Sequence, residues 1–458
     1  MKQRELVRLD RDLTEYLECI IDGMGRRDRQ TSARSYVMGL LLDGERKSIE
    51  PMASRLVDAP GHIQGMRQRL QECVSVSPWS DTDVLSRVAV KLEHELPGIA
   101  AFVVDDTGFP KKGTHSVGVM RQYSGTSGRI DNCQVAVSLH LAGEEGSGCI
   151  GFRLYLPETW ASDPERRRKA GVPEDVTFQT KWEISLGQIE TALKAGVERH
   201  PVLADAGYGD VTEFRQGLTK LGLEYVVGVN GTPVVWGPES NPQVPPRIPG
   251  KGHHPPTRYR DEEHPPVTIT DLAATLSYRK IGWREGSQRW QSSRFAAARV
   301  RTAHKHLLSR PPGQEQWLLC EWPKNEKQPT KFWLSTLPRS TSIRTLVRFA
   351  KLRWRVERDY QEMKQEVGLD HFEGRSWRGF HHHATLCCVA HAFLALKRAL
   401  FPPEHQEVDA PDGPPPSSDH PAEANRFLPA LPSSRRSRRT SARTVEALNA
   451  RTSHNPIE

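Results

Sequence analysis

Three acidic residues of this chain lie where a fold could bring them together. Asp106 follows the apolar run 99–104, and Asp205 follows a second apolar run, so each would stand at the end of a buried strand. Glu357 lies in a segment with helical periodicity. Two aspartates on strands and one glutamate on a helix suit a pair of divalent ions, which catalyse phosphoryl transfer.

The first of these acids has an equally acidic neighbour. Successive side chains on a strand point to opposite faces, so Asp105 and Asp106 would face opposite sides of the sheet. We choose Asp106, but the alternation does not say which face is the cleft, and Asp105 remains an alternative.

The third acid is carried by a predicted helix with one buried face. Apolar residues recur in steps of three and four at Leu346, Phe349, Leu352, Val356, Tyr360, Met363 and Val367. Arg353, Glu357 and Lys364 fall within roughly 40° of one another around this helix. Glu357 would therefore point into a cleft from the edge of the buried face.

The order of elements predicts the fold that positions these acids. Strands are expected at 100–104, 133–141 and 152–156, followed by a helix at 182–195. Further strands at 202–204 and 225–229 alternate with a helix at 211–221. This order is typical of an α/β (α+β) ribonuclease-H-like fold, a mixed sheet with flanking helices.

The rest of the chain divides by composition. Residues 1–96 read as a helical N-terminal domain that either binds DNA or is a solvated bundle, and residues 97–232 form the first part of the catalytic domain. A Pro-rich loop and a β-rich insertion occupy 233–340, before the final catalytic helices at 341–400. The Pro- and Arg-rich tail 401–458 is expected to be disordered.

Charge and composition restrict the function. The net charge is +8, which suits a polyanionic partner. The seven cysteines form no CxxC pair, so neither a disulfide scaffold nor a zinc finger is indicated. No apolar run approaches the ~20 residues of a membrane span, and the N-terminus lacks a signal-peptide pattern. We expect a cytoplasmic protein.

The predicted insertion mixes basic and aromatic residues. Trp283, Trp290, Arg284 and Arg289 lie in a stretch from 278 to 305 that is almost free of acids. Basic groups bind phosphates and aromatic rings stack on exposed bases, so DNA contact is favoured over a merely charged outer face. The triplet 381–383 is all histidine, and we expect it to be a solvated helix start rather than a metal site.

Several motifs resemble the DDE transposases of bacterial insertion sequences. The stretch 105–113 (Asp-Asp-Thr-Gly-Phe-Pro-Lys-Lys-Gly), with Arg-Gln-Tyr-Ser-Gly at 121–125, resembles the start of their catalytic domain. Ala-Asp-Ala-Gly-Tyr-Gly at 204–209 resembles their second acidic motif.

The third motif resembles the Tyr-Arg-Glu-Lys signature of that family. Arg353, Glu357 and Lys364 match its spacing, whereas Ala350 stands at the tyrosine position. The first aspartate of the family is typically followed by Thr or Ser, which favours Asp106 before Thr107.

The resemblance implies cut-and-paste DNA transposition of an insertion sequence. It implies two Mg²⁺ ions on Asp106, Asp205 and Glu357, with Mn²⁺ able to substitute. Arg353 and Lys364 would contact phosphates at the transposon end, and Trp283 or Trp290 would receive a flipped base. The expected partners are double-stranded DNA with terminal inverted repeats and target DNA. The protein would act as a homodimer on paired ends, near the nucleoid and not on a membrane.

Two other functions stay open from the sequence. A catalytically idle relative would occupy DNA ends as a regulator without cutting them. A ribonuclease-H-like nuclease of repair or RNA processing would use the same acids on other substrates.

Overall fold

The computed structural model describes residues 3–125, 128–243, 265–286, 290–303 and 311–400. Most of the Pro-rich loop, Arg289 and the tail 401–458 lie outside the described residues, so the predictions for them stay untested. Among the described helices, none combines the length and the apolar character needed to cross a membrane.

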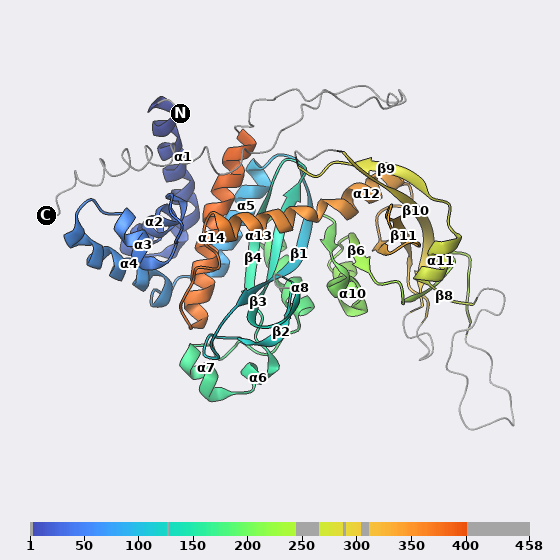
Figure 1. The fold of residues 1–458 in the computed structure, drawn as a ribbon, viewed down its shortest axis with the longest axis horizontal. Helices are drawn as coiled ribbons and strands as arrows, with labels where there is room; N and C mark the ends of the chain where they lie inside the picture. Colours follow the sequence, from blue (N-terminus) through green and yellow to red (C-terminus); the bar gives the residue numbers. More distant parts are fainter. Residues whose placement is uncertain (1–2, 126–127, 244–264, 287–289, 304–310, 401–458) are drawn as a thin grey trace.

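One mixed sheet forms the centre of the molecule (Figure 1). Its strands are β1 (Ile99–Pro110), β2 (Met120–Ser124), β3 (Arg129–Gly143), β4 (Ser147–Leu154), β5 (Val202–Ala204), β6 (Tyr225–Val229), β7 (Val234–Trp236), β8 (Val267–Thr268), β9 (Arg279–Trp283), β10 (Gln291–Thr302), β11 (Glu315–Trp322) and β12 (Lys331–Ser335).

Helices surround this sheet. They are α1 (Gln3–Ile21), α2 (Arg27–Leu41), α3 (Ile49–Arg55), α4 (Ile63–Ser75), α5 (Asp81–Glu95), α6 (Glu158–Ala161), α7 (Pro164–Ala170), α8 (Lys181–Lys194), α9 (Ala206–Gly209), α10 (Thr212–Lys220), α11 (Ile269–Thr275), α12 (Ile343–Leu352), α13 (Trp354–Gln365) and α14 (Trp377–Leu400).

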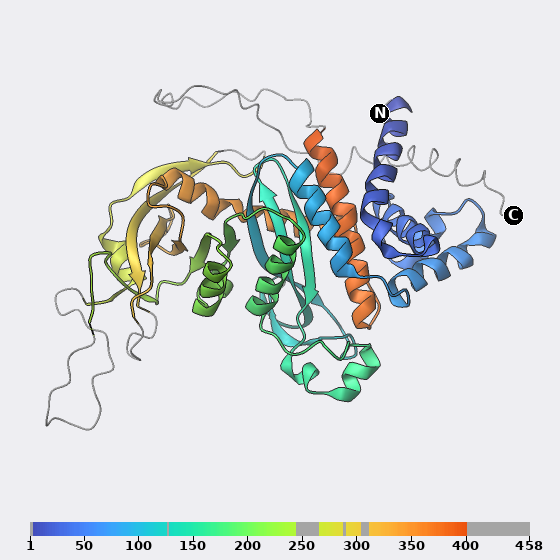
Figure 2. The same ribbon diagram turned by 180° about the vertical axis from the view of Figure 1, so that it is seen from behind.

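The predicted ribonuclease-H-like core is confirmed. Strands β1, β3 and β4 form an antiparallel meander, and β5 and β6 add to β1 in parallel. Strand β2, which the sequence did not predict, extends the meander by pairing with the start of β3. Helices α12 and α13 cross one face of the sheet, whereas α8 and α10 cover the other (Figures 1 and 2). The two faces therefore carry different surroundings for the residues of β1.

The β-rich insertion continues the same sheet. Strand β12 pairs antiparallel with β6, and β11, β10 and β7 follow outward. Some of its basic residues contact aromatic rings of the same sheet. Arg294 lies 4.1 Å from the ring centre of Trp322, and Arg299 lies 4.8 Å from that of Trp317. Arg299 also pairs with Glu315 at 2.8 Å.

The single helix expected around Glu357 is divided into two. Helix α12 ends at Leu352 and α13 begins at Trp354, with Arg353 between them. The Val356 amide donates to the Arg353 carbonyl at 3.1 Å, an i to i+3 bond typical of a tightened turn. The predicted apolar face is nevertheless largely buried on both segments.

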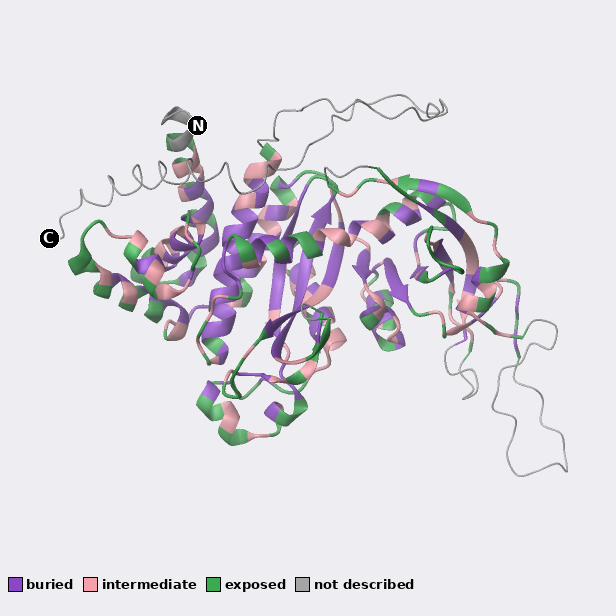
Figure 3. Cartoon of the chain, viewed as in Figure 1, coloured by how far each residue is buried: buried purple, intermediate pink, exposed green. Residues whose placement is uncertain are grey.

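The expectation of a solvated histidine triplet is wrong. Helix α14 begins at Trp377, before the triplet, and is buried on most sides (Figure 3). His381, His382 and His383 are all buried because α2, α4, α5 and β4 pack around this helix. The ring of His382 stacks on Trp79 with 3.6 Å between centres.

The N-terminal residues are helical, as predicted, and they pack on α14. The Tyr16 hydroxyl donates to the Val389 carbonyl at 2.9 Å, and the Tyr36 hydroxyl lies 2.9 Å from His383 Nδ1. These buried contacts join the two ends of the described chain into one core (Figure 2). Whether the helices bind DNA stays a prediction.

The buried histidines predict a pH-dependent stability. Burial lowers the pKa of His382 from 6.5 to about 4, so between these values only the unfolded chain takes up its proton. Stability from this residue is therefore complete above pH 6.5 and is lost as the pH falls towards 4. In His382→Phe, which can keep the stacking on Trp79, the loss of unfolding free energy between pH 7 and pH 5 should be smaller by about 2 kcal/mol.

Denaturant unfolding of wild type and His382→Phe at both pH values measures this difference. An equal loss in the two proteins would contradict the assignment of a neutral, buried His382.

Candidate active site

Strand β1 carries both candidate first acids, and they face opposite sides. Asp105 Oδ2 lies 2.7 Å from Arg353 Nη1, on the face that α12 and α13 cross. Asp106 Oδ2 lies 3.0 Å from Lys181 Nζ of α8 and accepts a 3.4 Å hydrogen bond from the Tyr208 hydroxyl. Of the two aspartates, Asp105 is the one on the side of Glu357.

The second acid lies level with Asp105 on the neighbouring strand. In the parallel pair of β1 and β5, Val103 is opposite Leu203, so two residues further on Asp105 and Asp205 stand side by side. Asp205 directly follows β5 and caps α9, where its Oδ1 accepts a hydrogen bond from the Gly207 amide at 2.9 Å. The sheet register therefore brings together two acids that are far apart in the sequence.

The third acid reaches this pair through an arginine. Arg353 binds Asp105 with one terminal nitrogen and Glu357 Oε1 with the other, at 2.9 Å. Asp105 is largely enclosed, with 14% of its side chain exposed, whereas 66% of the Glu357 side chain is exposed. The guanidinium thus lies between a buried and an exposed carboxylate.

Burial and neighbouring charges act on Asp105 in opposite directions. Burial raises the pKa of Asp105, Arg353 lowers it, and the charge of Asp205 raises it again, with a net value of about 6. The charged form of a carboxylate that is both desolvated and close to another acid is stabilised by a nearby cation.

Asp105, Asp205 and Glu357 could hold a divalent metal ion. Carboxylate oxygens are the ligands that Mg²⁺ prefers. The raised pKa of Asp105 means that its surroundings disfavour the charged carboxylate, and a bound cation would stabilise that charge. Within the described ranges, no three acidic, histidine or cysteine side chains are already gathered as a ligand set. Instead, Arg353 lies between two of the three acids.

Lys364 of α13, predicted to lie in line with Arg353 and Glu357, contacts β1 further along the strand. Lys364 Nζ donates to the Gly108 carbonyl at 3.1 Å and lies 5.2 Å from the ring centre of Phe109. Burial lowers the pKa of Lys364. Arg353, Glu357 and Lys364 therefore all lie along the carboxyl-terminal half of β1.

The two tryptophans of the insertion differ in their surroundings. Trp283 is half-buried: its indole N–H donates to Glu285 Oε1 at 2.7 Å and its ring meets Phe295 edge-on. Trp290 is 60% exposed, and Arg284 is exposed beside it in the β9–β10 connection. At Gly286 of this connection, a Cβ atom would stand 3.4 Å from the ring of Trp354, the first residue of α13.

Two features of the site were not chosen from the sequence. Asp105 was only the alternative, because strand alternation cannot identify the face that a later helix will cover. Lys181 was not considered, although the capping box between Thr180 and Glu183 is a sequence signal for a helix starting there.

The surroundings of Asp105 predict that this acid reduces stability. Its pKa of about 6 exceeds the ordinary 3.8, so above pH 6 the folded state carries a charge that burial disfavours. We expect Asp105→Asn to raise the unfolding free energy at pH 7.5 by about 1–3 kcal/mol, a gain that vanishes near pH 4. Asp106→Asn, which removes the partner of Lys181, should give no gain. Denaturant titrations at both pH values test this, and a destabilised Asp105→Asn would contradict it.

Comparison with known proteins agrees with this geometry. The sequence profile of the family described as DDE superfamily endonuclease matches residues 19–290, more than half of the chain. This range contains Asp105, Asp106 and Asp205 and ends before Glu357.

A curated relative gives a second match. The chain is 29% identical over 197 residues to the "Probable transposase for insertion sequence element IS701" of Microchaete diplosiphon. The aligned region covers 42% of this chain and 47% of that protein, so the chain spans about half the length of this relative. Because the profile matches more than half of its length, the chain belongs to the DDE superfamily endonucleases.

Proposed function

We propose that this protein is the transposase of an insertion sequence, which nicks the ends of the element, frees 3′-OH groups and joins them to target DNA. The observation that carries the proposal is that Arg353 binds both Asp105 and Glu357, while the parallel register of β1 and β5 brings Asp205 level with Asp105. Membership of the DDE endonucleases and the similarity to a probable transposase support it.

The proposal assigns the first metal-binding acid to Asp105 rather than to Asp106. Asp105 shares a face with Arg353 and Glu357, whereas Asp106 is held by Lys181 beneath the sheet. Asp105, Asp205 and Glu357 would hold two Mg²⁺ ions, or Mn²⁺ in their place. Such ions activate the attacking oxygen and stabilise the leaving one.

The basic and aromatic residues near the three acids and in the insertion would bind and orient DNA. Arg353 and Lys364 present cations along β1 on either side of Glu357, which suits contact with phosphates near the cut. Trp290 and Arg284 are exposed on the connection that touches the start of α13. Trp290 is therefore a better platform for a flipped base than Trp283, whose ring and N–H are already engaged.

Partners and location complete the proposal. The substrate would be double-stranded DNA with terminal inverted repeats, bound partly by the N-terminal helices, with target DNA as the second substrate. Pairing of two ends would require a homodimer. The net charge of +8 favours a protein that stays with cytoplasmic, nucleoid DNA.

Four substitutions test the acids. Excision of the element from a donor plasmid in Mg²⁺ should fall by at least about 10³-fold in Asp105→Asn, Asp205→Asn and Glu357→Gln, because each removes a charged metal ligand. Asp106→Asn should stay within about tenfold of wild type, since Asp106 faces α8. An inactive Asp106→Asn beside an active Asp105→Asn would reverse the assignment.

Exchange of one exposed ring tests the DNA platform. Trp290→Ala should reduce strand cleavage at the element's ends by about tenfold or more while end binding in EDTA persists, because stacking on a base contributes about 1–3 kcal/mol. Phe178→Ala, another exposed aromatic residue, serves as the control. Normal cleavage by Trp290→Ala would exclude the stacking role.

A further inference from the structure

The helix that carries Glu357 is attached to the sheet directly beside Asp105. In the antiparallel pair of β1 and β3, the residue opposite Asp105 is Ser138. The Ser138 hydroxyl lies 2.5 Å from the hydroxyl of Tyr360, which belongs to α13. A single hydrogen bond thus connects the strand position opposite one acid to the helix that carries another.

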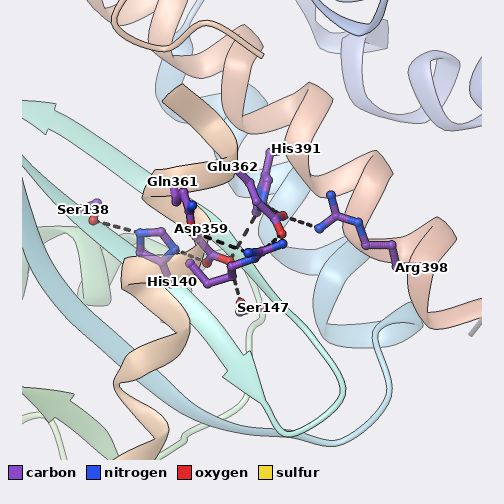
Figure 4. Close-up of polar contacts among 9 residues, drawn as sticks. Ser138, His140, Ser147, Asp359, Gln361, Glu362, His391 and Arg398 are labelled. Carbon is purple, nitrogen blue, oxygen red and sulfur yellow. Dashed lines mark hydrogen bonds and ion pairs between the residues drawn. The ribbon is translucent and has the colours of Figure 1, made fainter. Parts of the chain in front are cut away.

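From Ser138 a buried chain of hydrogen bonds continues back to the same helix (Figure 4). Ser138 Oγ lies 2.9 Å from His140 Nε2, and His140 Nδ1 lies 2.7 Å from Asp359 Oδ2. The other oxygen of Asp359 accepts a 2.6 Å hydrogen bond from Ser147, the first residue of β4. Two adjacent residues of α13, Asp359 and Tyr360, are therefore fixed to two strands.

Helix α13 is also fixed to α14. Glu362 Oε2 lies 3.3 Å from His391 Nε2 and also binds Arg398, and both partners belong to α14 (Figure 4). Although burial opposes its ionisation, His391 and Arg398 hold the pKa of Glu362 well below its usual range. Helix α13 is therefore fixed both to the sheet and to α14.

Such a network is a poor way to gain stability alone. Burying ionic and polar groups costs desolvation energy that well-packed apolar side chains would avoid. What hydrogen bonds add is direction, because a slip of one residue would move a helix by about 1.5 Å and turn it by about 100°. An apolar interface tolerates small slips of this kind, whereas paired donors and acceptors do not.

Glu357 depends on this support. The Glu357 side chain is 66% exposed and contacts Arg353, one helical turn earlier. The position of Glu357 relative to Asp105 is therefore set by the position of α13. Asp359 and Tyr360 follow within one turn of Glu357 and are buried.

We infer that the hydrogen-bonded set Tyr360, Ser138, His140 and Asp359 is a positioning device for the metal site. It sets the height and rotation of α13 so that Glu357 stays opposite Asp105 and Asp205. These four are positioning residues, since none of them is a metal ligand. The inference rests on the proposed function, because it assumes that the three acids share metal ions.

The test removes one hydroxyl and leaves the packing in place. Tyr360→Phe breaks the link to Ser138 but keeps the ring. Tyr225→Phe is the matched control: it removes another buried hydroxyl, which donates to Gln316 at 3.0 Å between β6 and β11, away from α13. Both variants are made in the full chain, and both should lose a similar, small amount of thermal stability.

Mn²⁺ binding, followed by electron paramagnetic resonance, is the first measurement. Loss of a residue that orients a metal ligand typically weakens metal binding about 10–100-fold, so the Kd for Mn²⁺ should rise about tenfold in Tyr360→Phe and stay unchanged in Tyr225→Phe. The second measurement is end cleavage against Mg²⁺ concentration. High Mg²⁺ should restore cleavage by Tyr360→Phe but not by Glu357→Gln, in which the ligand itself is changed.

Wild-type behaviour separates the two proposals. If wild type neither binds Mn²⁺ nor cleaves, the proposed function fails and the positioning role falls with it. If wild type does both and Tyr360→Phe matches it in Kd and Mg²⁺ requirement, only the positioning role is overturned. Should Tyr360→Phe not fold, Ser138→Ala breaks the same link from the strand side, and the same two results decide.

Discussion

The ion pairs of Arg353 connect the sheet to the helix that crosses it. One guanidinium binds Asp105 of β1, 248 residues away in the sequence, and Glu357 one turn along. Two carboxylates held at that spot without a cation would repel each other, and one of them is largely enclosed. The break between α12 and α13 falls at this arginine, so the helix is interrupted at the candidate site.

The β-rich insertion is joined by contacts to α12 and to the core sheet. Lys351, on the last turn of α12, pairs with buried Glu321 of β11 at 2.8 Å and lies 4.3 Å from the ring centre of Trp283. Strand β12 is hydrogen-bonded to β6 of the core. Only Leu352 separates Lys351 from Arg353, so contacts of the insertion with α12 lie directly beside the turn that carries Arg353.

Helix α14 connects the N-terminal helices with the sheet that carries the candidate site. It contacts α2, α4 and α5 as well as β4 and α13, which explains why its polar residues are buried. His381 donates from Nδ1 to the Trp377 carbonyl at 2.9 Å, and its Nε2 accepts from the Leu154 amide at 3.2 Å. Histidines at these positions satisfy backbone groups inside the core instead of facing water.

The sequence by itself determined the ribonuclease-H-like order of elements and the β-rich insertion, because hydrophobic periodicity and turn residues are local. It offered Asp205, Glu357 and one of the two neighbours Asp105 and Asp106 as candidate acids. Only the tertiary structure decided that Asp105 and not Asp106 faces α13, that the expected single helix is divided at Arg353, and that the three consecutive histidines are buried. Each of these depends on what packs against an element from far away in the chain. A strand alternates identically whichever face is covered, and a polar triplet reads as solvated until other helices enclose it.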